Sequence, residues 1–111
     1  MTSTLFITLT SPFEKNSIPG MSALSRSGKN GVLLFEDGIY YATHPAFLSA
    51  LKEQGLNIYA HTDSCRARGF MKLPGGVEPV DFDRAIDLIM EEYDTSITCV
   101  SGSSVTPGVR A

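Results

Sequence analysis

Two cysteines are the residues of this chain with the clearest capacity for chemistry. Cys65 lies two residues after Asp63, which can cap a short helical segment, and Arg66 and Arg68 follow it closely. Because a helix N-terminus and nearby cations favour the thiolate, Cys65 is the candidate nucleophile. The alternative interpretation is an incidental thiol without a role. Cys99 lies in a segment typical of a strand, where a small buried apolar side chain is the simplest interpretation.

Two adjacent carboxylates, Glu36 and Asp37, follow an apolar run and could form an acid–base pair. Neighbouring residues of a strand face opposite sides, however, so we favour a structural interpretation. Asp37 and Gly38 then form a strand-to-helix turn in which Asp37 caps the next helix. His44 is expected at a helix start and His61 at a strand end. Two histidines and two scattered cysteines show no metal-ligand spacing, and we expect neither a metal nor another cofactor.

The elements that position these residues alternate between strand and helix. The apolar run 32–35 predicts a strand buried on both faces, as in a parallel sheet covered by helices. Ligands of such sheets bind beyond the carboxyl ends of the strands, where Glu36 and Asp37 lie. Strands are expected at 4–9, 31–35, 57–61, 77–80 and 95–100, and helices at 16–27, 39–54, 63–68 and 81–93. This alternation predicts an α/β fold, a three-layer α/β/α sandwich around a five-stranded, mostly parallel sheet.

The segment after Asp81 is the clearest helix in the sequence. Asp81 can cap it, and apolar residues follow at the spacing of a single helical face. We expect that face to be buried, with the charged residues turned to solvent. The residues on the expected buried face are Phe82, Ala85, Ile86, Ile89, Met90 and Tyr93.

Composition limits the class of protein. The chain has 111 residues, of which 42% are hydrophobic, enough for one domain over residues 1–100. The tail 101–111 is rich in Ser and Gly, and we expect it to be disordered. A formal net charge of −3 argues against direct binding of nucleic acid or an anionic membrane. The sequence shows no membrane span, no basic signal-peptide start and no disulfide framework, so we expect a cytoplasmic protein.

Four segments in order carry a family resemblance. They are Ser11-Pro12-Phe13-Glu14-Lys15-Asn16-Ser17, the run from Val32 to Tyr40, Ala67-Arg68-Gly69-Phe70, and Val80-Asp81-Phe82. Together they resemble the DsrH/TusB family within the DsrE/F-like superfamily of sulfur-relay proteins. The resemblance implies a DsrE/F-like fold and assembly with DsrE/TusD-like and DsrF/TusC-like subunits. It also implies transfer of persulfide sulfur between donor and acceptor proteins, in sulfur oxidation or in 2-thiolation of the tRNA wobble uridine.

One position departs from the family pattern. Relatives in the DsrH branch typically carry a cysteine a few residues after the first of these segments, and the aligned residue here is Met21. A thioether cannot form a persulfide, so the family's cysteine chemistry does not transfer to this position.

We therefore expect an accessory subunit of a cytoplasmic sulfurtransferase complex that acts mainly by assembly and docking, without independent catalytic activity. An independent persulfide carrier that uses Cys65 is one alternative. A small flavodoxin-like domain that binds a ligand is the other. The sequence leaves open the pathway, the donor and acceptor proteins, and whether the oligomer contains one or several kinds of subunit.

Overall fold

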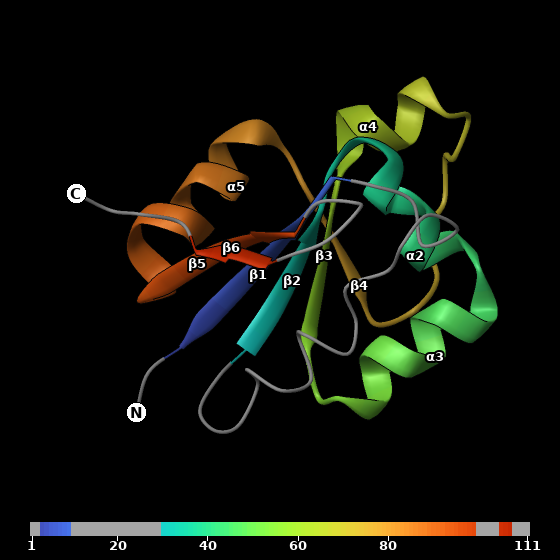
Figure 1. Ribbon diagram of the computed structural model, residues 1–111. Helices are drawn as coiled ribbons and strands as arrows, with labels where there is room; N and C mark the ends of the chain where they lie inside the picture. Colours follow the sequence, from blue (N-terminus) through green and yellow to red (C-terminus); the bar gives the residue numbers. More distant parts are fainter. Residues whose placement is uncertain (1–2, 10–29, 100–104, 108–111) are drawn as a thin grey trace.

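The computed structural model describes residues 3–9, 30–99 and 105–107 and has a single sheet at its centre (Figure 1). The strand order is β4-β3-β2-β1-β5-β6. Neighbouring strands from β4 to β5 are parallel, and β6 is antiparallel to β5. The strands are β1 (Thr4–Thr8), β2 (Asn30–Leu34), β3 (Asn57–His61), β4 (Val77–Val80), β5 (Thr95–Cys99) and β6 (Val105–Pro107). The prediction of a five-stranded, mostly parallel sheet is confirmed, with one short strand added at the β5 edge.

Helices cover both faces of this sheet and make the fold a three-layer sandwich. They are η1 (Glu36–Ile39), α2 (Tyr40–Thr43), α3 (Pro45–Glu53), α4 (Thr62–Ala67), α5 (Phe82–Asp87) and η2 (Leu88–Glu92). One apolar core joins Phe6, Leu34 and Ile58 of the sheet to Leu51 of α3 and other residues. A second core, on the opposite face, includes Leu33 and Leu88. The predicted α/β/α sandwich is confirmed.

The apolar run of β2 divides between the two cores. Val32 and Leu34 pack in the first core and Leu33 in the second, and all three side chains are fully buried. A strand with buried side chains on both faces can be apolar throughout, which explains why this run shows no alternation of polar residues. The run ends at the carboxyl edge of the sheet, where the candidate site lies.

The predicted buried face of the last helix is partly wrong. Phe82, Ile86 and Met90 are 60%, 40% and 63% exposed, whereas Leu88, which the spacing placed off the buried face, is fully buried. Ala85 and Leu88, three residues apart, form the buried row instead. The last turn is a π-helix, in which the Tyr93 amide donates to the Leu88 carbonyl, five residues back, at 3.2 Å.

The π-turn rotates Tyr93 away from the row that it would occupy in a continuous α-helix. Tyr93 is buried, and its hydroxyl lies 3.0 Å from that of Tyr59 in the second core. Tyr93 therefore joins Ala85 and Leu88 in the second core, and Ile89 packs against the same core at its margin. The expected cap is confirmed, since an Asp81 carboxylate oxygen accepts the Arg84 amide at 2.8 Å.

Two further expectations concern residues 16–27 and 101–111. Val105–Pro107 pairs with β5 as β6, and the other residues of the tail 101–111, which we expect to be disordered, lie outside the described residues. The expected helix at 16–27 lies outside the described residues. Within the described part of the chain, none of the helices combines the length and apolar character that crossing a membrane requires.

Candidate functional site

The turn after β2 brings the backbone of the expected site close to β1. Glu36 has a φ of 52°, a left-handed conformation that is uncommon for a residue with a side chain. The Phe35 amide donates to the Thr8 carbonyl at 3.0 Å, and the Gly38 amide donates to the Phe35 carbonyl at 2.8 Å. A Cβ atom at Gly38 would lie 2.2 Å from the Thr8 carbonyl oxygen, so this close approach requires glycine. The predicted strand-to-helix turn at Asp37 and Gly38 is confirmed.

Asp37 has a different role from the predicted cap. No side-chain hydrogen bond caps η1. Instead, Arg68 of the segment after α4 donates to one Asp37 carboxylate oxygen from Nε at 3.0 Å and from Nη2 at 2.8 Å. The same guanidinium lies 3.7 Å from a Glu36 carboxylate oxygen and donates to the Ser64 carbonyl at 3.2 Å. Both carboxylates therefore face one cation, which fixes α4 against η1.

Ser64 connects three elements at this edge of the sheet. Its hydroxyl oxygen accepts the Glu36 amide at 3.0 Å and lies 2.9 Å from Nδ1 of His61, the last residue of β3. The His61 ring packs against Phe35, with ring centroids 4.6 Å apart. Sequence reasoning missed Ser64, although its position one residue before Cys65 gave a signal. His44 and His61 lie at a helix start and a strand end, as predicted.

Cys65 is buried in the first core and is only 4% exposed. Burial raises the pKa of its thiol, and the nearby Arg68 charge opposes this rise without overcoming it. The sequence predicted the opposite direction. Helix α4 has only six residues and begins at Thr62, with no side-chain cap, so Asp63 lies in its first turn. Desolvation dominates because little of the Cys65 side chain is exposed to solvent.

Arg66, the other cation expected to favour the thiolate, pairs with Asp63. Arg66 is exposed and lies 3.4 Å from the Asp63 carboxylate, with which it forms an ion pair. Within the described part of the chain, the Cys65 sulfur has no hydrogen-bond partner. A nucleophilic cysteine needs an adjacent base or a lowered pKa, and this thiol has neither among the described residues.

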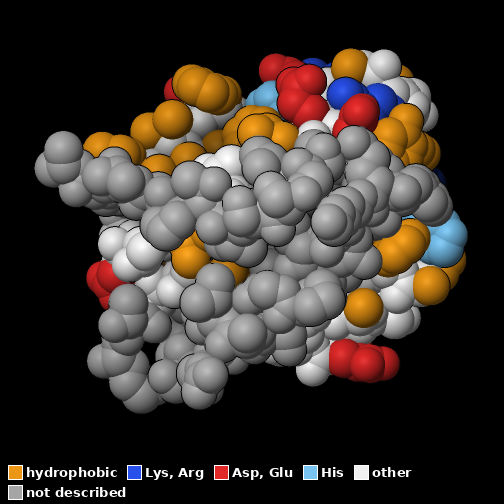
Figure 2. All heavy atoms as spheres, in the orientation of Figure 1, with side chains coloured by type: hydrophobic (Ala, Val, Ile, Leu, Met, Phe, Trp, Pro, Cys, Tyr) orange, Lys and Arg blue, Asp and Glu red, His pale blue; other side chains and the backbone are white. Residues whose placement is uncertain are grey.

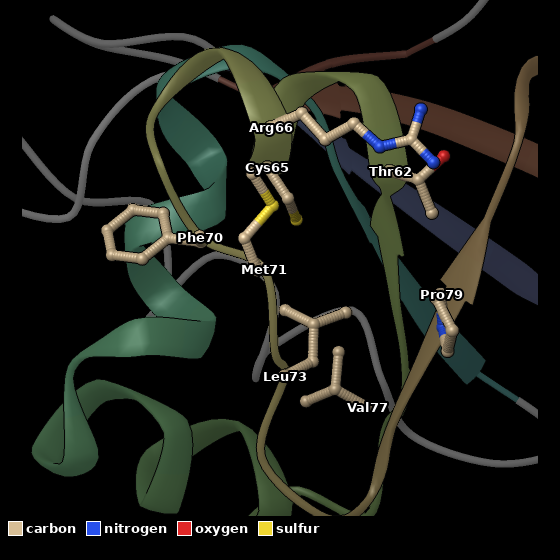
Figure 3. A pocket seen from close by; sticks show the side chains of 8 residues that line it. All are labelled: Thr62, Cys65, Arg66, Phe70, Met71, Leu73, Val77 and Pro79. Atoms are coloured by element: carbon tan, nitrogen blue, oxygen red, sulfur yellow. The ribbon is translucent and has the colours of Figure 1, made fainter.

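A pocket of about 260 Å³ opens beside Cys65. In Figure 3 the Cys65 side chain points from α4 into this pocket, and the Met71 side chain reaches up beside it in this view. The remaining lining residues are Thr62, Arg66, Phe70, Leu73, Val77 and Pro79. Phe70 also lines a neighbouring pocket of about 430 Å³ over α2 and α3. The surroundings of the thiol are mainly apolar and suit a small apolar group better than an ionised nucleophile.

Among the described residues, Cys99 lies apart from Cys65, because β5 is three strands away from β3, the strand that precedes Cys65. Cys99 ends β5, where its backbone pairs with Thr8 and Val105, in agreement with the predicted strand. Met21 and the segment from Ser11 to Ser17 lie outside the described residues. Among the residues that the structure does describe, no three His, Cys, Asp or Glu side chains are arranged to share a metal ion.

Comparisons with known proteins agree with this fold and with the ordered segments. The crystal structure of the YchN protein from E. coli is similar, with a TM-score of 0.73 at 17% sequence identity. The likeness covers 89% of this chain and 100% of that chain, and at this identity it shows the fold. A search among curated proteins found no match. A family model described as DsrH like protein matches residues 10–95. Because this match spans most of the chain, the chain belongs to the DsrH-like protein family, and the family supports a sulfur-relay-related protein.

Proposed function

We propose that this protein is the DsrH-like subunit of a cytoplasmic sulfur-transfer complex and contributes by assembly and docking. Its partners are a DsrE/TusD-like and a DsrF/TusC-like subunit, together with the sulfur donor and acceptor proteins. The complex serves sulfur oxidation or 2-thiolation of the tRNA wobble uridine.

The observation that carries this proposal is the burial and raised pKa of the Cys65 thiol. Sulfur transfer through a cysteine needs a thiolate that can attack the outer sulfur of a donor persulfide. The family position for such a cysteine is occupied here by Met21. Cys65 is buried, and its pKa is raised. Neither residue supplies a ready thiolate, so docking of the partner subunits is the role that the chain can fill.

A persulfide carrier that uses Cys65 is the second candidate, and one observation favours it. The Cys65 side chain lines a pocket rather than a sealed core, and Met71, which shares that pocket, is 78% exposed. A movement of Met71 would open the thiol to a donor. The raised pKa opposes this role, because at neutral pH it leaves a smaller fraction of thiolate than an ordinary cysteine has.

Co-expression with the two partner subunits tests the proposed function. We expect the three chains to purify together through a tag on one partner, and native mass spectrometry to show a complex of fixed stoichiometry. The matched control replaces the partners by unrelated proteins of similar size. A chain that remains separate from both partners, under conditions in which the partners bind each other, would contradict the proposal.

A further inference from the structure

A row of exposed apolar side chains runs along α5 and η2. Phe82, Ile86 and Met90 are four residues apart, which places them on one side of the helix. All three are large exposed hydrophobic residues, and the row extends over roughly 12 Å. We call this row the α5 stripe. In Figure 2, hydrophobic side chains gather over α5 at the upper left of the molecule.

The described part of the chain covers the second core, on which α5 and η2 pack, incompletely. Among the described helices, only α5 and η2 contribute buried side chains to the second core. Ile7, Phe35 and Ile89 are only partly buried at the margin of this core. Aromatic residues and methionine are enriched in the buried centres of protein interfaces, so the composition of the stripe suits an interface.

A row of carboxylates lies beside the α5 stripe. Asp83, Asp87 and Glu91 each follow one residue after a member of the stripe, and all three are exposed. Within the described part of the chain, none of the three forms an ion pair. The arginine of the same helix, Arg84, pairs instead with Glu78 and Glu92. Among the described residues, the edge of the stripe is therefore negative, and no ion pair neutralises these three carboxylates.

From this arrangement we infer that the α5 stripe docks a different subunit, one with an apolar contact surface bordered by Lys or Arg. Basic residues at the rim of the partner would face the three carboxylates, and such complementary charges steer association and fix register. A second copy of this chain fits less well, because two paired stripes would bring equally acidic borders into one interface. The inference rests on the proposed function, in which the partner is a DsrE-like or DsrF-like subunit.

The experiment measures binding of the full-length chain to the purified partner subunits. Phe82→Gln with Met90→Gln should raise the dissociation constant about tenfold or more, because exposed apolar anchors at the centre of an interface carry much of the affinity. Thermal unfolding should change little, since both side chains are more than half exposed. The matched control is Ala46→Gln, at an exposed position of α3, which should bind as the wild type does.

A charge variant tests the second element of the inference. Asp87→Lys should lower the association rate several-fold and reduce its dependence on salt concentration, because the carboxylate row steers the partner. Glu53→Lys, an equal change of charge at the exposed end of α3, should leave both unchanged.

The outcomes separate this inference from the proposed function. Wild-type binding with unaltered affinity in the Phe82, Met90 and Asp87 variants would overturn the assigned surface and leave the proposed function intact. Absence of wild-type binding to either partner would overturn both. If the wild-type chain forms a homodimer that the Phe82 and Met90 changes dissociate, the occupant is a second copy and the assignment of a different subunit is wrong.

Discussion

Leu88→Ala is expected to destabilise the protein by about 2–5 kcal/mol, the usual cost of removing a large aliphatic side chain from a core. Leu88 is fully buried in the second core, between η2 and the sheet, and it lies at the start of the π-turn. The loss of its side chain leaves a cavity that Ala85 is too small to fill. Denaturant unfolding of the wild type and of Leu88→Ala gives the difference in the free energy of unfolding, provided that this free energy depends on denaturant concentration with the same slope in both proteins.

The control for this variant is Ile86→Ala on the same helix. Ile86 is 40% exposed and lies on the α5 stripe, so its truncation should cost less than about 1 kcal/mol. A similar loss for the two variants, or a larger loss for Ile86, would mean that the helix presents to the sheet the face predicted by its spacing.

Gly38→Ala is expected to cost on the order of 3 kcal/mol, near the upper end for overpacking a tight site. The added Cβ would lie 2.2 Å from the Thr8 carbonyl oxygen and 3.0 Å from its carbon. Both are backbone atoms of the central strand β1, and that oxygen also accepts the Phe35 amide. Relief of the clash therefore requires a shift between β1 and η1, which a change of side-chain rotamer cannot provide.

Gly75→Ala is the matched control for the change at Gly38. A Cβ atom at Gly75 would meet no atom within 4 Å. Gly75→Ala lowers the conformational entropy of the unfolded chain as Gly38→Ala does, but without a clash in the folded state. We therefore expect its stability to be unchanged or raised by up to about 1 kcal/mol. The measurement is the unfolding midpoint of each variant under the same conditions. A Gly38→Ala protein as stable as the Gly75→Ala protein would show that the turn at Gly38 is not tightly packed.

The sheet could be predicted from the sequence because its signals are local. The run 32–35 is apolar throughout, as in a strand buried on both faces, and Gly38 marks the turn that follows it. The rotation of the last helix could not be predicted in the same way. The π-turn at Leu88–Glu92 brings Tyr93 into the row of Ala85 and Leu88, whereas a spacing argument that assumes a continuous α-helix places Tyr93 in the row of Phe82 and Ile86.

The site shows the same division between local and non-local causes. The position of Cys65 on a short helix after β3 follows from neighbouring residues, and that part of the prediction is confirmed. Whether the pKa of Cys65 is raised or lowered depends on which side chains of the helix face the core. Desolvation raises this pKa, whereas the sequence predicted that it would be lowered. Arg68 and Asp37 are thirty-one residues apart, so the residues near either one do not predict that the two pair.

The central claim, that this subunit docks its partners and does not itself carry sulfur, is tested most directly by mass spectrometry of the assembled complex after incubation with a persulfide donor. We predict no stoichiometric gain of a sulfur atom on the Cys65 peptide, and sulfur transfer by a Cys65→Ser complex within about twofold of the wild type. Slow, substoichiometric modification that no partner removes agrees with this prediction, because any thiol reacts to some extent. A stoichiometric persulfide on Cys65 that is discharged to a partner subunit, together with loss of transfer in Cys65→Ser, would contradict it.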